Sequence, residues 1–285
     1  MQISQNTSKI PGQGSPARSL WYDRLWAALI FFTRLPFWRI YQPPKEAYQG
    51  VVEFWPLAGW LTAGIMAGVL YGTSMVFNYE IAIVLAVVSR LLLTGALHED
   101  GLADFFDGFG GGGRDRQRIL DIMKDSHIGT YGVLALIVYF ALLFFALHSL
   151  TPVDAAFAIL IVDPYAKMMS AFVIQAMPYA RTEETAKNKT VYRKFSVAAG
   201  IGLAIQGLLP IGLYLWWMQE RLRLGELGSG MRIDGSALIF LPCLTTCFLY
   251  LLIWRRLRGY TGDCCGALFL LTELTAYLVI SCCLA

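Results

Sequence analysis

Six aspartates lie within a 26-residue stretch of an otherwise apolar chain, and five of them fall into two regularly spaced blocks: Asp100, Asp104 and Asp107, then Asp121 and Asp125. The first three are spaced i, i+4, i+7 and the last two are four residues apart, so each block would place its carboxylates on one face of a helix. Carboxylates at these spacings repel one another by about 0.2–0.5 kcal/mol per pair. A hard cation removes that repulsion and takes carboxylate oxygens as ligands. The spacing therefore predicts a site for Mg²⁺ or a related cation.

The same segment contains other groups that phosphate chemistry needs. A cation held by carboxylates binds phosphate, and phosphoryl transfer depends mainly on positioning and charge neutralisation. Gly108 and the run 110–113 allow close backbone approach to a phosphate, and Arg114, Arg116 and Arg118 follow. A spare aspartate can accept a proton from an attacking hydroxyl. The alternative is a solvated acidic loop, but the shared faces and the small flanking residues favour a functional cluster.

Three further side chains, His98, His127 and Asp263, have two interpretations each. His98 is a ligand or, because the cluster offers oxygen and not the nitrogen and sulfur that zinc prefers, a structural or supporting group. His127 contacts phosphate or caps a helix end. Asp263 joins the same cation site from the C-terminal segment, or Thr261 or Asp263 caps the helix that follows.

Composition indicates the elements that must position these residues. The chain has 285 residues, 56% of them hydrophobic and 15% charged, with a mean hydropathy of +0.54. Soluble proteins carry about 25% charged residues, so we predict an all-α, polytopic membrane helix bundle. The net charge of +3 is too small to indicate a nucleic-acid partner. The six cysteines lack zinc-type spacing and are interpreted as buried apolar side chains.

Seven segments are long and apolar enough to be predicted spans. Residues 1–18 are expected to form a disordered tail, and residues 19–285 a single membrane-embedded catalytic domain. Leu20–Trp38 is predicted to be an interfacial or re-entrant helix that ends near Pro36. Residues 98–130 are expected to form an acidic loop. The predicted spans are 51–73, 78–97, 131–150, 155–177, 196–218, 236–254 and 266–285.

Basic residues alternate between the connecting segments. They are dense before the first predicted span and in the segments after the second, fourth and sixth spans, and are absent or balanced by acids in the others. The positive-inside rule therefore places the N-terminus and the acidic segment in the cytosol. Within the spans, Asp163 and Lys167 are four apart and can form an ion pair, whereas Lys167 and Arg90 are also candidates for binding an anionic substrate.

One long run carries a family resemblance. The sequence from Thr94 to Gly112, which reads TGALHEDGLADFFDGFGGG, resembles the signature of the cobalamin synthases, also called adenosylcobinamide-GDP ribazoletransferases. The segments Ile122–Ser126 and Ile128–Gly132 are similar too. Shorter similarities occur in order along nearly the whole chain: Phe32–Pro36, Pro178–Arg181, Thr261–Asp263 and Gly266–Ala267.

The resemblance implies a Mg²⁺-dependent, multi-pass enzyme of the bacterial inner membrane with its active site facing the cytosol. Its substrates would be adenosylcobinamide-GDP and α-ribazole or the 5′-phosphate of α-ribazole, and GMP would leave. Membrane lipid and a second copy of the chain are further candidate partners. The expected metal ligands are Glu99, Asp100, Asp104, Asp107, Asp125 and Asp263. The expected catalytic residues are Asp104, Asp121 and Asp125, of which Asp121 or Asp125 is the candidate base. The expected substrate-binding residues are Arg34, Arg90, His127, Lys167 and Arg181, with Gly110 and Gly111.

The chain departs from the family pattern at several positions, and other functions remain open. The family commonly has Arg at the positions of His127 and Lys167, a different run at 184–186, and Glu at Leu270. These changes affect substrate binding more than the acidic cluster, because Lys lacks the bidentate contact of Arg. A CDP-alcohol phosphotransferase or a membrane prenyltransferase is the main alternative, and a cation or corrinoid transporter is a second.

Overall fold

The computed structural model describes residues 19–181, 192–224 and 235–284. Ten α-helices and two 3-10 helices make up nearly all of this part, which confirms the all-α prediction. Outside regular helices it has a single isolated bridge, between Tyr179 and Tyr260. The tail predicted at 1–18 and the divergent run 184–186 lie outside the described residues.

Six helical segments among the described residues are long and apolar enough to cross a membrane, and a bent pair makes a seventh. Their positions agree with the seven predicted spans to within a few residues at most ends. The first is a 3-10 segment, η2 (Lys45–Phe54), that continues into α2. The bounds are α2 Trp55–Ser74, α3 Tyr79–Thr94 with α4 Leu97–Gly111, α6 Thr130–His148, α7 Pro152–Ala176, α8 Val197–Arg223, α9 Gly235–Leu257 and α10 Gly262–Leu284.

The bend between α3 and α4 is the departure that matters for function. Gly95 and Ala96 both have positive φ, 66° and 55°, which ends α3 and turns the chain by 89° into α4. Because α4 begins at Leu97 and α5 covers Arg116–Lys124, most of 98–130 is helical. The acidic segment predicted between the spans is thus built from helices, in agreement with the helical spacing of its aspartates. Its apolar residues Leu102, Phe105 and Ile119 are buried and draw both helices onto the bundle.

The N-terminal helix is also shorter than predicted. Helix α1 covers Trp21–Phe32, and a 3-10 turn, η1, follows at Phe37–Arg39. Twelve residues cannot cross a bilayer, and Trp21 and Trp38 are exposed, which agrees with an interfacial helix. Glu53 ties α1 to the start of the first span, because its carboxylate accepts a hydrogen bond of 2.5 Å from Arg24.

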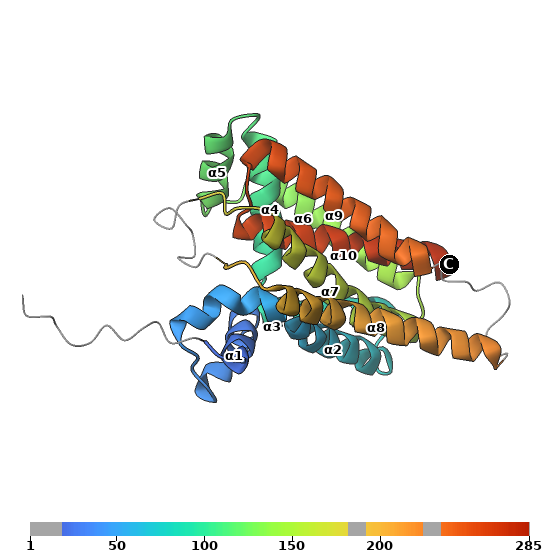
Figure 1. The fold of residues 1–285 in the computed structure, drawn as a ribbon. Helices are drawn as coiled ribbons and strands as arrows, with labels where there is room; N and C mark the ends of the chain where they lie inside the picture. The colour runs from blue at the N-terminus through green and yellow to red at the C-terminus, as the bar shows by residue number, and fades with distance from the viewer. Residues whose placement is uncertain (1–18, 182–191, 225–234, 285) are drawn as a thin grey trace, which may run out of the picture.

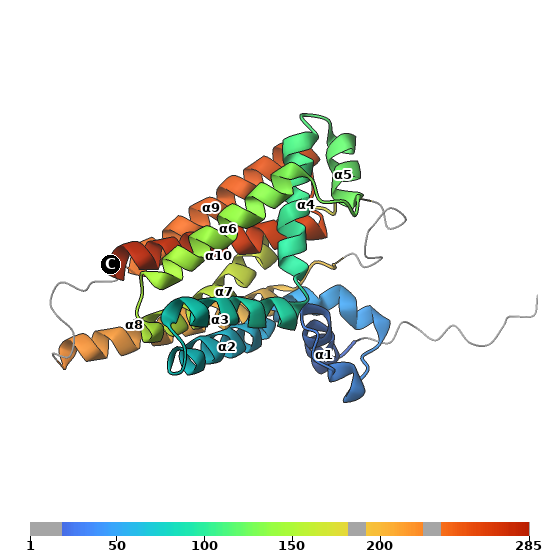
Figure 2. The ribbon, with the colours of Figure 1, turned by 180° about the vertical axis from the view of Figure 1, so that it is seen from behind.

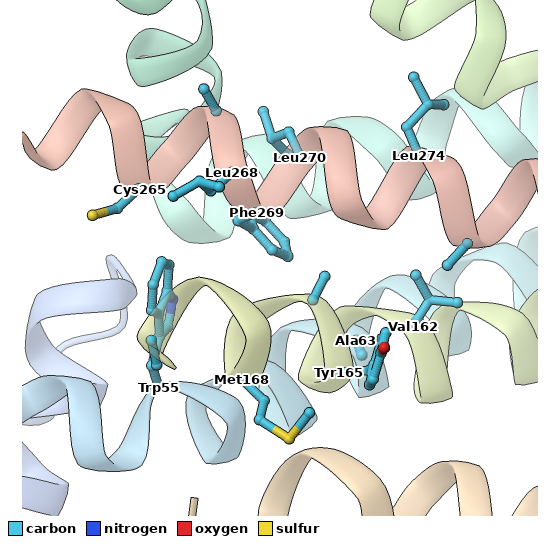
Figure 3. Close-up of a cluster of buried hydrophobic side chains, with 14 of the residues drawn as sticks. Trp55, Ala63, Val162, Tyr165, Met168, Cys265, Leu268, Phe269, Leu270 and Leu274 are labelled. Atoms are coloured by element: carbon cyan, nitrogen blue, oxygen red, sulfur yellow. The ribbon is translucent and has the colours of Figure 1, made fainter. Parts of the chain in front are cut away.

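The centre of the molecule is formed by α2, α7 and α10. Most of α7 and α10 is buried by the other helices, whereas α8 and α9 leave apolar side chains such as Trp216 and Phe248 exposed, as expected of surfaces that face lipid. Figure 3 shows Trp55 of α2 lying near Phe269 of α10 in this core, with their ring centroids 6.3 Å apart. Helices α1, α4 and α5 lie at one end of the bundle, away from the C-terminus (Figure 1 and Figure 2).

Candidate active site at the crossing of α4 and α10

Helix α4 crosses α10 with almost no side chain between their backbones. A Cβ atom added to Gly101 would lie 3.1 Å from the Cα of Asp263, and one added to Gly266 would lie 2.9 Å from the carbonyl oxygen of His98. Only glycine allows so close an approach. The crossing therefore brings the first aspartate of the acidic cluster, Asp100, close to the N-terminal turn of α10, where Asp263 lies.

Asp100 and Asp263 line the same cavity, which has a volume of about 180 Å³. Thr261 accepts the backbone N–H of Cys264 at 3.2 Å and so caps α10, and Asp263 lies in the first turn of that helix. The positive end of the helix dipole favours an anion or a bound carboxylate there. Asp100 is exposed, so the cavity is accessible from outside the bundle. Its other walls are Phe31, Phe32, Val52, Trp55, Leu97, His98, Ile174, Tyr192, Gly262, Cys265 and Gly266.

The aspartates of α4 do not share one role. Asp104 lies one turn after Asp100 and is buried. Asp107 accepts hydrogen bonds from the backbone N–H groups of Gly129 at 2.7 Å and Gly132 at 2.9 Å, and so satisfies the N-terminus of α6. Its oxygens are committed to that helix end, which argues against the predicted role of Asp107 as a metal ligand.

Glu99 points into the bundle, away from the cavity walls. One of its oxygens lies 3.4 Å from a guanidinium nitrogen of Arg90, and the other is buried without a hydrogen-bond partner in the described part of the chain. Arg90 also donates to Glu273 at 2.6 Å and to the hydroxyl of Tyr139 at 2.8 Å. This arginine is only 1% exposed, so its prediction as a substrate-binding residue does not agree with its engagement in a buried ion pair.

Lys167 is engaged in the same way. Its ammonium group lies 2.6 Å from Asp163 and 2.8 Å from the hydroxyl of Thr62, and it faces the ring of Phe269 at 4.8 Å. The structure therefore favours the intramembrane ion pair that the four-residue spacing suggested over the binding of substrate. Both partners are almost fully buried between α2 and α7.

The residues predicted beyond α4 lie on the surface. Asp121 accepts a hydrogen bond of 2.9 Å from Gln117, and Asp125 follows α5 as its C-cap. His127 lies 2.7 Å from Asp125, and both are exposed. The hydrogen bond between the two side chains raises the pKa of His127 and lowers the pKa of Asp125. Neither Asp121 nor Asp125 lines the cavity.

The predicted phosphate-binding groups divide into two sets. Gly110 and Gly111 lie in the last turn of α4, where Gly110 packs on the ring of Tyr131, so they do not form an open phosphate-binding loop. Arg34 is exposed, and its side chain packs on Gly95 at the bend before α4. Arg181 donates to the carbonyl of Leu120 at 2.9 Å, while its Nε and one terminal nitrogen are buried without partners in the described residues. Arg34 and Arg181 thus retain the capacity to bind an anion.

The positions of the six predicted metal ligands limit how this chain can hold a metal ion. Across the residues that the structure describes, no three carboxylate, imidazole or thiol side chains gather to form a metal site. The six predicted ligands therefore do not form one preformed cage, because Glu99, Asp107 and Asp125 turn to other partners. Mg²⁺ usually takes one or two carboxylates and completes its shell with water and substrate phosphates. Asp100 and Asp263 at one cavity fit a cation of that kind.

Sequence reasoning did not identify the aromatic walls of the cavity. Trp55 stacks on Phe32 with ring centroids 5.1 Å apart, and His98 lies 5.8 Å from Trp55. These residues belong to three separate helices, and their spacing along the chain carries no signal of their contact. The bend at residues 95–96, which brings His98 to Trp55, likewise has no counterpart in the apolar pattern.

A family model and the curated relatives of this chain point to the same family. The model of the family described as cobalamin-5-phosphate synthase matches residues 24–281. A protein of Leptothrix cholodnii is 35% identical over 256 residues, which cover 88% of this chain and 92% of that protein. A protein of Leptospira interrogans is 30% identical over 266 residues, or 91% and 95% of the two chains. A Vibrio cholerae protein is 34% identical over 254 residues, or 89% and 91%. All three are named adenosylcobinamide-GDP ribazoletransferase. No solved structure matches the chain.

Proposed function

The chain belongs to the cobalamin-5-phosphate synthase family, and from this premise we propose that it transfers the cobinamide phosphate of adenosylcobinamide-GDP to ribazole. The observation that carries the proposal is the meeting of Asp100 and Asp263 at one cavity. These two residues are far apart in sequence, and both lie in segments that resemble the family. Their convergence at a helix crossing supports a site for a charged, phosphate-bearing substrate.

The proposed reaction exchanges the phosphoanhydride bond of a pyrophosphate for a phosphodiester bond. A ribose hydroxyl oxygen of α-ribazole, or of its 5′-phosphate, bonds to the phosphorus that carries cobinamide. The bond from that phosphorus to the oxygen of GMP breaks, the proton of the hydroxyl passes to a base, and GMP leaves. The products are adenosylcobalamin, or its 5′-phosphate, and GMP. In such reactions catalysis consists mostly of positioning and of neutralising the charge on the phosphate oxygens.

The carboxylates are proposed to hold Mg²⁺ against the pyrophosphate. A divalent cation bound there would neutralise the phosphate charge and polarise the bond that breaks. Asp100 and Asp263 lie on the cavity, and Asp104 follows Asp100 by one turn of α4. Of the three aspartates predicted to be catalytic, only Asp104 shares this helix, because Asp121 and Asp125 belong to α5 and its C-cap. The proposal therefore centres on Asp104.

The arginines at this end of the bundle are proposed to bind the phosphates. Arg181 has two buried guanidinium nitrogens without partners in the described residues, and it follows the bridge that joins Tyr179 to Tyr260, shortly before Asp263. A guanidinium with unused donors is suited to a phosphate, because it binds two oxygens at once. We place this site on the cytosolic face of the inner membrane, since basic residues cluster in the segments at the same end.

A product assay tests the proposal directly. Purified protein in detergent is incubated with Mg²⁺, adenosylcobinamide-GDP and α-ribazole, and the nucleotide released and the corrinoid formed are identified by mass. The proposal predicts GMP and cobalamin, both lost when a chelator removes the cation. Release of CMP from a CDP-alcohol donor, or of pyrophosphate from a prenyl donor, with no GMP from adenosylcobinamide-GDP, would contradict it.

A further inference from the structure

The cavity beside Asp100 and Asp263 has a chemical character that binding a phosphate does not require. Apart from its carboxylates, its walls are largely aromatic and aliphatic, including Phe31, Phe32 and Ile174. Phosphate oxygens gain nothing from such walls, because burying a charged group beside apolar carbon is costly. The deep part of the cavity therefore suits an apolar, planar group that is attached to the charged part of a substrate.

Two cavity-lining residues, Trp55 and His98, each have a buried polar atom that lacks a partner among the described residues. Trp55 is 2% exposed and His98 is 4% exposed, yet the indole Nε1 of Trp55 and the Nε2 of His98 make no hydrogen bond within the described part of the chain. An unsatisfied buried donor costs about 1–3 kcal/mol, and unpaired groups of this kind are uncommon in native proteins. Indole can only donate, so Trp55 requires an acceptor. Figure 3 shows the ring of Trp55 held in the core near Cys265 and Phe269.

The size of the cavity restricts what fills it. An apolar cavity of about 150 Å³ is known to hold one benzene molecule. At about 180 Å³ and open on one side, this cavity accepts a bicyclic heterocycle and excludes a corrin macrocycle. Pockets that enclose a whole drug-sized ligand are larger, about 300–1,000 Å³. The cavity is thus the size of one base of a nucleoside.

We infer that this cavity binds the benzimidazole base of ribazole, with the indole N–H of Trp55 donating to the free ring nitrogen of the base. The inference rests on the proposed function and adds to it the position of the acceptor substrate. Dimethylbenzimidazole has one acceptor nitrogen and otherwise apolar edges, which matches one unpaired donor among apolar walls. With the base in the cavity, the attached ribose lies toward its open side, where Asp100 and Asp263 are.

The other base in the reaction is the guanine of the donor substrate, and it is less well matched. Guanine carries N–H donors on its base-pairing edge, which would face Phe31, Phe32 and Ile174 without acceptors. Among the described residues that line the cavity, Asp100 and Asp263 are the only charged acceptors, and the proposed function uses them at the phosphate. Steady-state kinetics can separate the two bases, because each belongs to a different substrate.

The test replaces Trp55 by Phe, which keeps the ring that stacks on Phe32 and removes the N–H donor. We expect the KM for α-ribazole to rise about tenfold, with kcat and the KM for adenosylcobinamide-GDP within twofold of the wild-type values. Trp216→Phe is the matched control, because this tryptophan is 65% exposed on α8, and it should change neither KM. Thermal unfolding in detergent checks that both variants fold as the wild type does.

A binding measurement on the wild-type protein decides the inference without any variant. 5,6-Dimethylbenzimidazole is titrated into the purified protein by calorimetry, in the absence and presence of α-ribazole or GMP. The inference is supported if 5,6-dimethylbenzimidazole binds, if α-ribazole abolishes this binding, and if GMP leaves it unchanged. Absence of binding, competition by GMP, or a Trp55→Phe variant that raises only the KM for the donor would overturn it. If the wild type releases no GMP at all, the proposed function fails, and this titration still tests the cavity.

Discussion

Identical residue types on one helix face carry different tasks in this protein. Asp104 and Asp107 are three positions apart on α4, yet Asp107 accepts hydrogen bonds from two backbone N–H groups at the start of α6. Asp104 instead lies one turn after Asp100, which lines the cavity. Spacing alone could predict that the carboxylates share a face. It could not predict which carboxylate a distant helix end would use, because that depends on how the chain returns at Gly129.

Replacing Asp107 should therefore act on stability. Asp107→Ala leaves two N–H groups of α6 without their charged acceptor, and we expect the free energy of unfolding to fall by about 2–3 kcal/mol. Unfolding in mixed detergent micelles measures the loss. The control is Asp121→Ala, at an exposed position, which should stay within about 0.5 kcal/mol of the wild type. An equally stable Asp107→Ala variant that has lost its Mg²⁺ requirement would contradict the structural role.

The pair formed by Asp125 and His127 gives a prediction about pH. Asp125 raises the pKa of His127 above its ordinary value of 6.5 by accepting its hydrogen bond. A raised pKa in the folded state means that the pair stabilises the fold below the ordinary histidine pKa, and that this contribution is lost as pH rises through the raised value. Because both groups are exposed, the effect on stability is small and the titration is the better readout.

With three histidines in the chain, nuclear magnetic resonance of histidine-labelled protein can follow the titration of His127 directly. In Asp125→Asn we expect its pKa to shift downward, toward the ordinary value. Glu80→Gln, which removes the partner of His148 instead, is the control and should leave His127 unchanged. A His127 pKa that is the same with and without Asp125 would show that the two side chains do not pair in solution.

At the scale of elements, the function depends on one bend and one crossing. The left-handed residues Gly95 and Ala96 turn α4 across the bundle, and the glycines at positions 101 and 266 let it approach α10. Hydropathy predicted the spans well, because apolar length is enough to identify a membrane helix. It could not show that the acidic segment 98–130 packs onto the bundle, because charged residues lower the mean hydropathy even where a helix buries its other face.

The crossing can be tested by adding a single methyl group. Gly266→Ala would place a Cβ atom 2.9 Å from the carbonyl oxygen of His98, so α4 and α10 must separate. We expect a loss of about 1–3 kcal/mol in stability and a clear fall in kcat as Asp100 moves away from Asp263. Gly202→Ala in α8, where nothing lies within 4 Å, is the matched control. Full activity in Gly266→Ala would mean that the two aspartates need not be close.

At the scale of the whole molecule, buried ion pairs connect the helices. Arg90 of α3 binds Glu273 of α10, and Lys167 of α7 binds Asp163 with Thr62 of α2 beside them. The sequence showed that charges inside spans must find partners, and it correctly suggested the pair of Asp163 and Lys167, which are four residues apart. It could not suggest the pair of Arg90 and Glu273, because 183 residues separate them.

Glu273→Gln should consequently destabilise the bundle without weakening substrate binding. The change leaves the buried Arg90 with less compensating charge, and breaking such a pair costs about 3–5 kcal/mol. We expect a lower unfolding temperature in detergent and unchanged KM values. Glu220→Gln, which disturbs an exposed contact of 3.8 Å with Arg223, serves as the control. A stable variant with a raised KM for adenosylcobinamide-GDP would instead return Arg90 to the substrate site.

The most direct test of the account is the rate of GMP release by Asp104→Asn. This substitution keeps the size and polarity of the side chain and removes its charge. We predict that the variant inserts and unfolds like the wild type, that it releases no measurable GMP from adenosylcobinamide-GDP and α-ribazole, and that added Mg²⁺ does not restore the rate. Turnover close to the wild-type rate, with the same dependence on Mg²⁺, would contradict the claim that the carboxylates at the crossing of α4 and α10 hold the cation.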